Sequence, residues 1–218
     1  MHFWRKVDCH YSFMHENLMD MNHQFLHRGI MGTIKPTLLD YSRGDDWVEV
    51  RYRFEQAAGK PDKGADFMMA GGTKRNGNQQ RGDVMTIRTQ YPYQTLNICR
   101  GGAEDPAFNL WVVHVPYYKE QRSHVSVGML LIQKPPIPGL IYVLWPFIRR
   151  LAESVFTEDR MAVEAEQKAH DLQQADWNQE VNPVILDLRN VLIRKGVPLE
   201  PEAARAAAAG ESPALQRI

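Results

Sequence analysis

Two histidines and a carboxylate lie close together near the start of this chain, in the segment MHENLMDMNHQFLHR at 14–28. The segment contains few β-branched residues and is followed by Gly29, so we expect one helix that ends there. At about 100° per residue, His23 and His27 then lie one turn apart on one face, with Asp20 beside them. Two neutral imidazoles at this spacing can bind one metal ion, and a carboxylate can orient such a ligand. A solvated helix face that carries two histidines would show the same pattern.

A single carboxylate interrupts an apolar stripe much further along the chain. Residues 147–171 are expected to form a long helix, and Asp159 falls on its apolar face, between Val155 and Val163. Burying an ionised carboxylate without a partner is costly, so a cation must meet it. A buried arginine and a metal ion would both satisfy this requirement. Glu158 lies at the edge of the stripe, where a supporting or surface role is expected.

Together, His23, His27 and Asp159 make up a 2-His-1-carboxylate set. Such a set leaves coordination positions open and suits non-haem Fe(II) that activates dioxygen. The only cysteines are Cys9 and Cys99. Two cysteines are too few for a disulfide framework or for a four-thiolate zinc or iron–sulfur site.

The elements that must position these residues are a first helix, several strands and then the long helix. Strand-like runs occupy 2–10, two stretches within 32–56, and then 83–91, 94–100, 108–116 and 123–133. Residues 57–82 are rich in Gly, Lys and Asn and are expected to form a long excursion or lid. After the long helix, Asn182-Pro183 is expected to open an extended piece, with a short helix at 186–194. This order predicts an α+β domain over 1–200, followed by an Ala-rich, disordered tail over 201–218.

Composition narrows the class of protein further. The chain has 218 residues, and its 26 Lys and Arg balance its 26 Asp and Glu. This balance gives no global reason to expect a nucleic-acid partner. The N-terminus lacks an apolar signal segment, and the longest apolar stretch, 137–148, is interrupted by Pro138 and Pro146. Since a membrane span needs about 20 apolar residues, we expect no span and a cytoplasmic location.

Two motifs carry a resemblance to a known family. The stretch ENLMDMNHQFLHRG at 16–29 resembles the catalytic-domain motif of Rieske non-haem iron oxygenases, and FTEDRMAVEAEQ at 156–167 resembles the helix that supplies their carboxylate ligand. The match covers roughly residues 1–195 and is most similar to the vanillate demethylase and phthalate dioxygenase branch. The gap between the histidines is three residues, where many members have four.

The resemblance implies a helix-grip (START-like) fold, in which an antiparallel sheet wraps around a long C-terminal helix. It implies that His23, His27 and Asp159 bind mononuclear Fe(II). It also implies that Asp20 is the acid through which electrons reach the iron, and that Asn17 lies near the iron. The implied activity is O2-dependent hydroxylation or demethylation of a small aromatic or other apolar organic substrate. The implied assembly is a homo-oligomer, specifically a trimer.

The Rieske domain is missing from the chain as we interpret the sequence. A Rieske [2Fe–2S] cluster needs a Cys-x-His and a Cys-x-x-His pair, and neither Cys9-His10-Tyr11 nor Cys99-Arg100-Gly101-Gly102 fits. We therefore expect the chain to be a fragment, a truncated product or half of a split enzyme. Electrons would come from a reductase and from a Rieske centre on another chain or on a missing N-terminal domain.

Two other function classes stay open. A helix-grip domain can enclose an apolar ligand without catalysis, and the same three ligands could bind zinc in a hydrolase. Metal analysis of the purified protein separates the first alternative from an oxygenase. Candidate substrate-pocket walls are Phe108, Leu110, Val112 and His114 on one strand face, with Met68 and Met69 from the long excursion.

Overall fold

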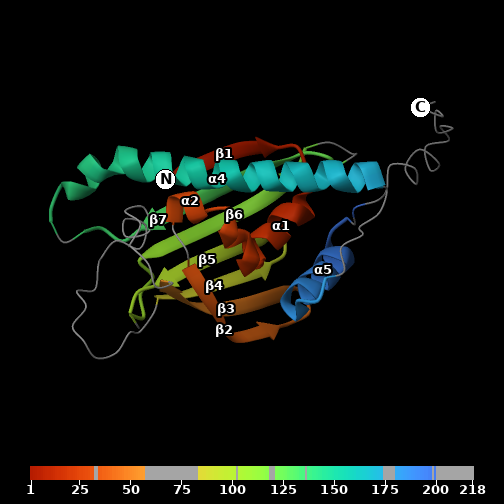
Figure 1. Cartoon of the computed structure of the whole chain (residues 1–218), viewed down its shortest axis with the longest axis horizontal. Helices are drawn as coiled ribbons and strands as arrows, with labels where there is room; N and C mark the ends of the chain where they lie inside the picture. The colour runs from red at the N-terminus through yellow and green to blue at the C-terminus, as the bar shows by residue number, and fades with distance from the viewer. Residues whose placement is uncertain are drawn as a thin grey trace.

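A seven-stranded antiparallel sheet forms the centre of the computed structural model (Figure 1). The structure describes residues 1–31, 34–56, 83–101, 103–117, 121–135, 137–173, 180–197 and 199. The spatial order of the strands is β1-β7-β6-β5-β4-β3-β2. Their bounds are His2–Val7 (β1), Ile34–Arg43 (β2), Trp47–Gln56 (β3), Asp83–Gln90 (β4), Tyr93–Cys99 (β5), Phe108–Pro116 (β6) and His124–Ile132 (β7). β2 to β7 pair with their neighbours in sequence, and only β1 crosses over, to pair with β7.

Helices cover one side of this sheet, as Figure 1 shows. They are α1 (Tyr11–Met19), the 3-10 helix η1 (Met21–Phe25), α2 (Arg28–Met31), the long α4 (Leu140–Gln173) and α5 (Pro183–Lys195). α1 contacts β4 and β6 as well as α4 and α5, and α5 contacts β3. α4 passes over the other end of the sheet, where Phe3 on β1 meets Phe156 with ring centroids 6.2 Å apart. The predicted α+β class and helix-grip fold are confirmed.

The strand predictions agree with the structure to within about three residues at each end, but the helix predictions need correction. α4 begins at Leu140, seven residues before the predicted start, and contains Pro146. The proline forfeits one backbone hydrogen bond near the first turns, where neighbours such as Tyr142 and Phe147 are exposed. The predicted extended piece at Asn182-Pro183 is also wrong. Asn182 caps α5 by accepting from the Val184 amide, and Pro183 is the first helical residue, a position that suits proline.

Two apolar clusters hold the helices on the sheet. The larger joins α1, β2 to β5 and α5, and includes Tyr11, Val50, Ile87 and Leu188. The smaller lies between α1 and α4 and consists of Val7, Cys9, Phe13, Met14 and Val163, with Phe156 packed against it. Because α1 belongs to both clusters, the residues that follow it are held between the sheet and α4.

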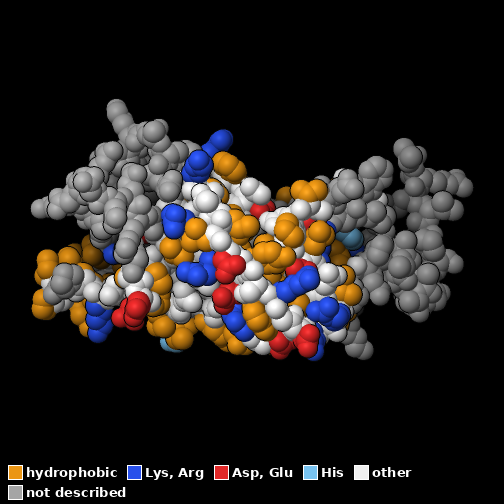
Figure 2. Space-filling model, turned by 90° about the horizontal axis from the view of Figure 1, so that it is seen from below, with side chains coloured by type: hydrophobic (Ala, Val, Ile, Leu, Met, Phe, Trp, Pro, Cys, Tyr) orange, Lys and Arg blue, Asp and Glu red, His pale blue; other side chains and the backbone are white. Residues whose placement is uncertain are grey.

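The surface agrees with the charge balance of the sequence. On the side drawn in Figure 2, Lys and Arg side chains alternate with Asp and Glu, and no continuous basic area is visible there. Among the described helices, none is both long and apolar enough to cross a membrane. The excursion at 57–82, with Met68 and Met69, and the tail at 201–218 lie outside the described residues.

Candidate metal centre

The segment that carries the two histidines is not one helix. α1 ends at Met19, and Asp20 adopts an extended conformation with φ −80° and ψ 113°. Its side-chain Oδ1 accepts hydrogen bonds from the Asn22 amide at 2.9 Å and from Asn22 Nδ2 at 3.0 Å, which starts η1. The prediction of a single helix over 14–28 is therefore wrong. Aspartate competes for backbone amides and favours caps over helix interiors, which is the local reason for the break.

The break nevertheless brings the predicted ligands together. His23 comes from η1, His27 lies between η1 and α2, and Asp159 comes from the middle of α4. One ligand atom from each of the three lies within 4.8 Å of the other two. The imidazole rings of His23 and His27 have their centroids 5.3 Å apart at an interplanar angle of 84°. This convergence depends on the packing of α4 against α1 rather than on helical spacing.

Hydrogen bonds fix which imidazole nitrogens are available. His27 Nδ1 lies 2.8 Å from Glu158 Oε2, so Nδ1–H donates to this carboxylate. His23 Nδ1 contacts the backbone carbonyl of Asp20 in the same way. In each ring the remaining Nε2 then carries a lone pair.

The lone pair on His27 meets a second electron-rich atom. Its Nε2 lies 3.1 Å from Asp159 Oδ1, and within the described part of the chain this buried Nε2 has no well-formed hydrogen bond. A nitrogen lone pair and a carboxylate oxygen at this distance require a cation, either a proton or a metal ion, between or beside them. The residues present therefore fit a divalent metal with nitrogen and oxygen ligands.

The electrostatics of the two residues are coupled. Burial lowers the pKa of His27, but its contacts with Asp159 and Glu158 outweigh burial and raise that pKa above its ordinary value. Burial raises the pKa of Asp159, but His27, His23 and Asn17 together lower it below its ordinary value. Each group thus stabilises the charged form of the other, and the site favours positive charge beside Asp159.

The other predicted residues surround these ligands. Asn17, on α1, donates a hydrogen bond from Nδ2 to Asp159 Oδ1 at 2.8 Å, which orients the carboxylate. Glu158 turns toward His27 instead of solvent. The Asp20 carboxylate caps η1, and it is the Asp20 carbonyl that meets His23. Among the described residues no arginine pairs with Asp159, so the alternative of a buried Arg–Asp pair is not observed.

An apolar cavity of about 120 Å³ ends at this site. It lies between the sheet and α4, and Asp159 forms part of its wall. The other lining residues are Met1, Phe3, Arg5, Phe108, Leu110, Leu130, Ala152, Glu153, Val155 and Phe156. Of the predicted pocket walls on β6, Phe108 and Leu110 line this cavity. Val112 and His114 share their strand face but are buried further along it.

Three histidines that no sequence pattern groups together lie in the core where α1 packs on the sheet. His15, His114 and His124 are each at most 4% exposed. The rings of His15 and His114 are 4.9 Å apart, and those of His114 and His124 are 5.3 Å apart. They come from α1, β6 and β7, so only tertiary packing makes them neighbours.

Comparison with known proteins agrees with the geometry. Residues 7–194 match the vanillate O-demethylase oxygenase C-terminal domain. A 4beta-methylsterol monooxygenase from Methylococcus capsulatus is 27% identical over 200 residues, which are 87% of this chain and 49% of that protein. The chain thus spans about half the length of this curated relative.

Solved structures show the same fold at low identity. Dicamba monooxygenase bound to dicamba superposes with a TM-score of 0.56 and 16% identity, covering 89% of this chain and 56% of that one. The terminal oxygenase of carbazole 1,9a-dioxygenase from Nocardioides aromaticivorans gives a TM-score of 0.51 and 16% identity, covering 90% and 57%. The chain therefore belongs to the family of vanillate O-demethylase oxygenase C-terminal domains, the catalytic domains of Rieske oxygenases.

Proposed function

We propose that this chain is the oxygenase catalytic domain of an enzyme that hydroxylates or demethylates a small apolar organic substrate. His23, His27 and Asp159 are the residues that would hold Fe(II). Bound there, the metal would supply the redox chemistry that activates O2. The observation that carries the proposal is the convergence of three ligand atoms within 4.8 Å, with the lone pair of His27 Nε2 facing Asp159. Family membership supports the same assignment.

The surrounding residues have distinct tasks in this proposal. Glu158 and the Asp20 carbonyl each accept an Nδ1–H, which fixes the tautomer in which Nε2 of His27 and of His23 is the atom available to a metal. Asn17 holds one oxygen of Asp159 in place. The apolar cavity beside Asp159 would place the substrate next to the metal and exclude water from it.

Electrons would reach the site from outside the described domain. We propose that a Rieske [2Fe–2S] centre on another chain or on a preceding domain donates them, supplied in turn by a reductase. Asp20 is the residue proposed to connect that centre with His23, because it follows α1 directly and its carbonyl already contacts the His23 ring. A ring of identical subunits, such as a trimer, would bring the [2Fe–2S] cluster of a neighbouring subunit close to Asp20 and His23.

Anaerobic titration of the purified chain with Fe(II), followed by metal analysis, tests the ligand assignment. We expect about one iron per chain, and its loss in His23→Ala, His27→Ala and Asp159→Ala, with unchanged circular dichroism. Substitution with Co(II) adds a visible spectrum that reports the ligand set independently of turnover. His2→Ala, which removes an exposed imidazole on β1, is the control and should keep the metal.

Retention of stoichiometric iron in any two of the three ligand variants would contradict the assignment. A wild-type chain that binds no iron but binds apolar ligands in the cavity would instead favour the alternative, a helix-grip module without catalysis. Because such ligands generally bind zinc more tightly than Fe(II), only hydrolytic activity that depends on zinc would favour the hydrolase.

A further inference from the structure

Among the described residues, one arginine lines the apolar cavity that ends at Asp159. Arg5, on β1, lines the cavity together with Glu153, which lies six residues before Asp159 on α4. Arg5 and Glu153 are both about one-third exposed, with side-chain exposures of 33% and 34%. The pair therefore stands where the cavity meets solvent. An unpaired arginine at this position would make a binding site for a substrate carboxylate.

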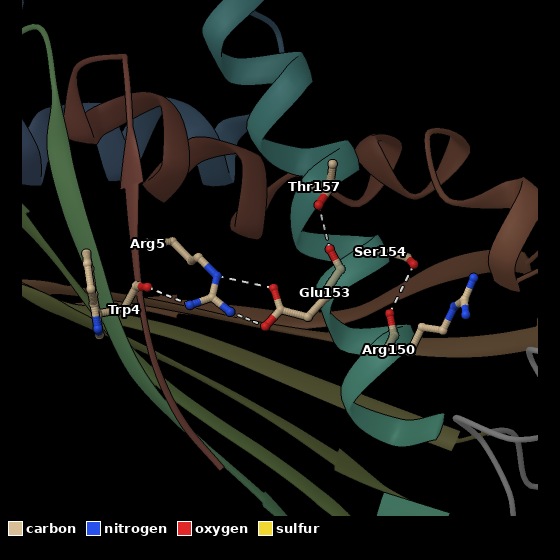
Figure 3. Close-up of polar contacts among 6 residues, drawn as sticks. All are labelled: Trp4, Arg5, Arg150, Glu153, Ser154 and Thr157. Atoms are coloured by element: carbon tan, nitrogen blue, oxygen red, sulfur yellow. Dashed lines mark hydrogen bonds and ion pairs between the residues drawn. The ribbon is translucent and has the colours of Figure 1, made fainter. Parts of the chain in front are cut away.

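Each nitrogen of this guanidinium already has an acceptor, as Figure 3 shows. Arg5 Nε donates to Glu153 Oε2 at 3.2 Å, and Nη2 donates to Glu153 Oε1. Nη1 donates to the backbone carbonyl of Trp4 at 2.7 Å. The first two bonds form the bidentate geometry that arginine and carboxylate favour. Glu153 therefore occupies the face of Arg5 that a substrate acid would need.

The charge in the cavity wall offers an acid no excess of positive charge. Among the described lining residues the charged groups are Arg5, Glu153, Asp159 and the N-terminal ammonium of Met1, which donates to the Leu130 carbonyl. Glu153 neutralises Arg5, and the Asp159 carboxylate offsets the ammonium. The remaining lining residues are apolar, so burial of apolar surface is the main favourable contribution open to a ligand. A volume of about 120 Å³ is close to the roughly 150 Å³ cavity known to bind benzene, so one ring fits.

We infer that Glu153 is a specificity-determining residue: by holding Arg5 it makes the cavity select neutral, apolar ligands of about one ring over carboxylates. This inference rests on the proposed function only in treating the cavity as the substrate site. Removing the Glu153 charge frees the guanidinium for a ligand carboxylate and removes the preference for the neutral ligand.

Toluene and benzoate are suitable probes, since they share a ring and differ in the anionic group. Ligand-observed NMR titrations on the full chain measure both dissociation constants at low and high salt. For the wild type we expect benzoate to bind at least about tenfold more weakly than toluene. In Glu153→Gln we expect benzoate to bind at least about tenfold more tightly than in the wild type, with a salt-sensitive gain, while toluene changes by less than about twofold.

Three further variants test whether the gain in benzoate affinity comes from Arg5 and from binding in the cavity. Arg5→Gln combined with Glu153→Gln removes the freed guanidinium and should abolish the benzoate gain. Ala152→Leu fills the cavity and should weaken both probes. Glu164→Gln removes a carboxylate on the same helix that lies outside the cavity lining, and should leave the preference of the wild type unchanged.

Wild-type protein that binds benzoate as tightly as toluene would overturn the inference, and this test needs no variant to fold. A benzoate gain that persists in the double variant would also overturn it. Iron analysis of the same samples separates the two proposals: selectivity without iron binding would refute only the proposed oxygenase, whereas iron binding without selectivity would refute only the role of Glu153.

Discussion

The three buried histidines beside α1 make the stability of the fold depend on pH. Burial, with smaller contributions from His124 and His10, lowers the pKa of His15 to about 3. Burial also lowers the pKa of His114 well below its ordinary value. For His124 burial again dominates and lowers the pKa, although the Cys9 carbonyl, Asp8 and Glu164 oppose it. His15 and His114 are therefore neutral in the folded protein at mildly acidic pH, and His124 is harder to protonate than a free imidazole.

Whether the stability rises or falls with pH follows from how many protons the folded and the unfolded chain bind. Between pH 6.5 and about 3, the unfolded chain binds a proton at residue 15 and the folded chain does not, so stability falls as pH is lowered through 6.5. The slope of the unfolding free energy against pH approaches about 1.4 kcal/mol per pH unit for each such histidine. For His15 alone, moving from pH 8 to pH 5 costs about 2 kcal/mol in the free energy of unfolding.

Urea unfolding of metal-free wild type and His15→Leu at several pH values measures this contribution. Leucine has a similar volume and no titrating group, so comparison of the two proteins cancels the other ionisable residues, including His27. We expect the variant to lose about 2 kcal/mol less than the wild type between pH 8 and pH 5. His2→Gln, which removes an exposed imidazole, should keep the wild-type dependence. Parallel pH dependences for wild type and His15→Leu would refute the reasoning.

Two further predictions concern the electron path and the packing of β1. Asp20→Asn should keep iron within about twofold, because asparagine is an equally good cap for η1 and the backbone carbonyl that contacts His23 is retained. It should slow reduction by a supplied Rieske protein by more than about tenfold in stopped-flow absorbance, because it removes the carboxylate charge that would accept a hydrogen bond from that partner. Equal reduction rates would remove Asp20 from the electron path, and loss of iron would make it a ligand. Gly128→Ala places a methyl group 2.4 Å from Phe3 Cζ and 2.8 Å from the Trp111 carbonyl, so we expect a loss of about 1–3 kcal/mol in urea unfolding. The exposed Gly29, where a methyl group meets nothing within 4 Å, provides the control substitution Gly29→Ala, and equal effects of the two would contradict the packing argument.

Local patterns in the sequence are sufficient for most of the strands and for singling out the three residues of the proposed ligand set. Alternation over runs such as WVEVRYRF, at 47–54, predicts β3, because a half-buried strand needs a period of two whatever its partners are. Asp159 could be singled out because a carboxylate within an apolar helical stripe needs a cation. His23 and His27 could be singled out by residue type and by the family resemblance, although the helix invoked for them does not exist.

Tertiary structure alone decided how those residues meet. The cap at Asp20 ends α1, and the packing of α4 on α1 then sets Asp159 against His27. Glu158 contacts His27 across 131 positions in sequence, a separation at which helical periodicity gives no information. The same holds for His15, His114 and His124, and for Arg5 and Glu153, which are 148 positions apart.

The sequence by itself thus determined which residue types could bind a metal and which segments alternate. The pairing of β1 with β7 and the placement of α4 decided which side chains share a cavity, because contacts between distant elements depend on packing geometry that no local period encodes.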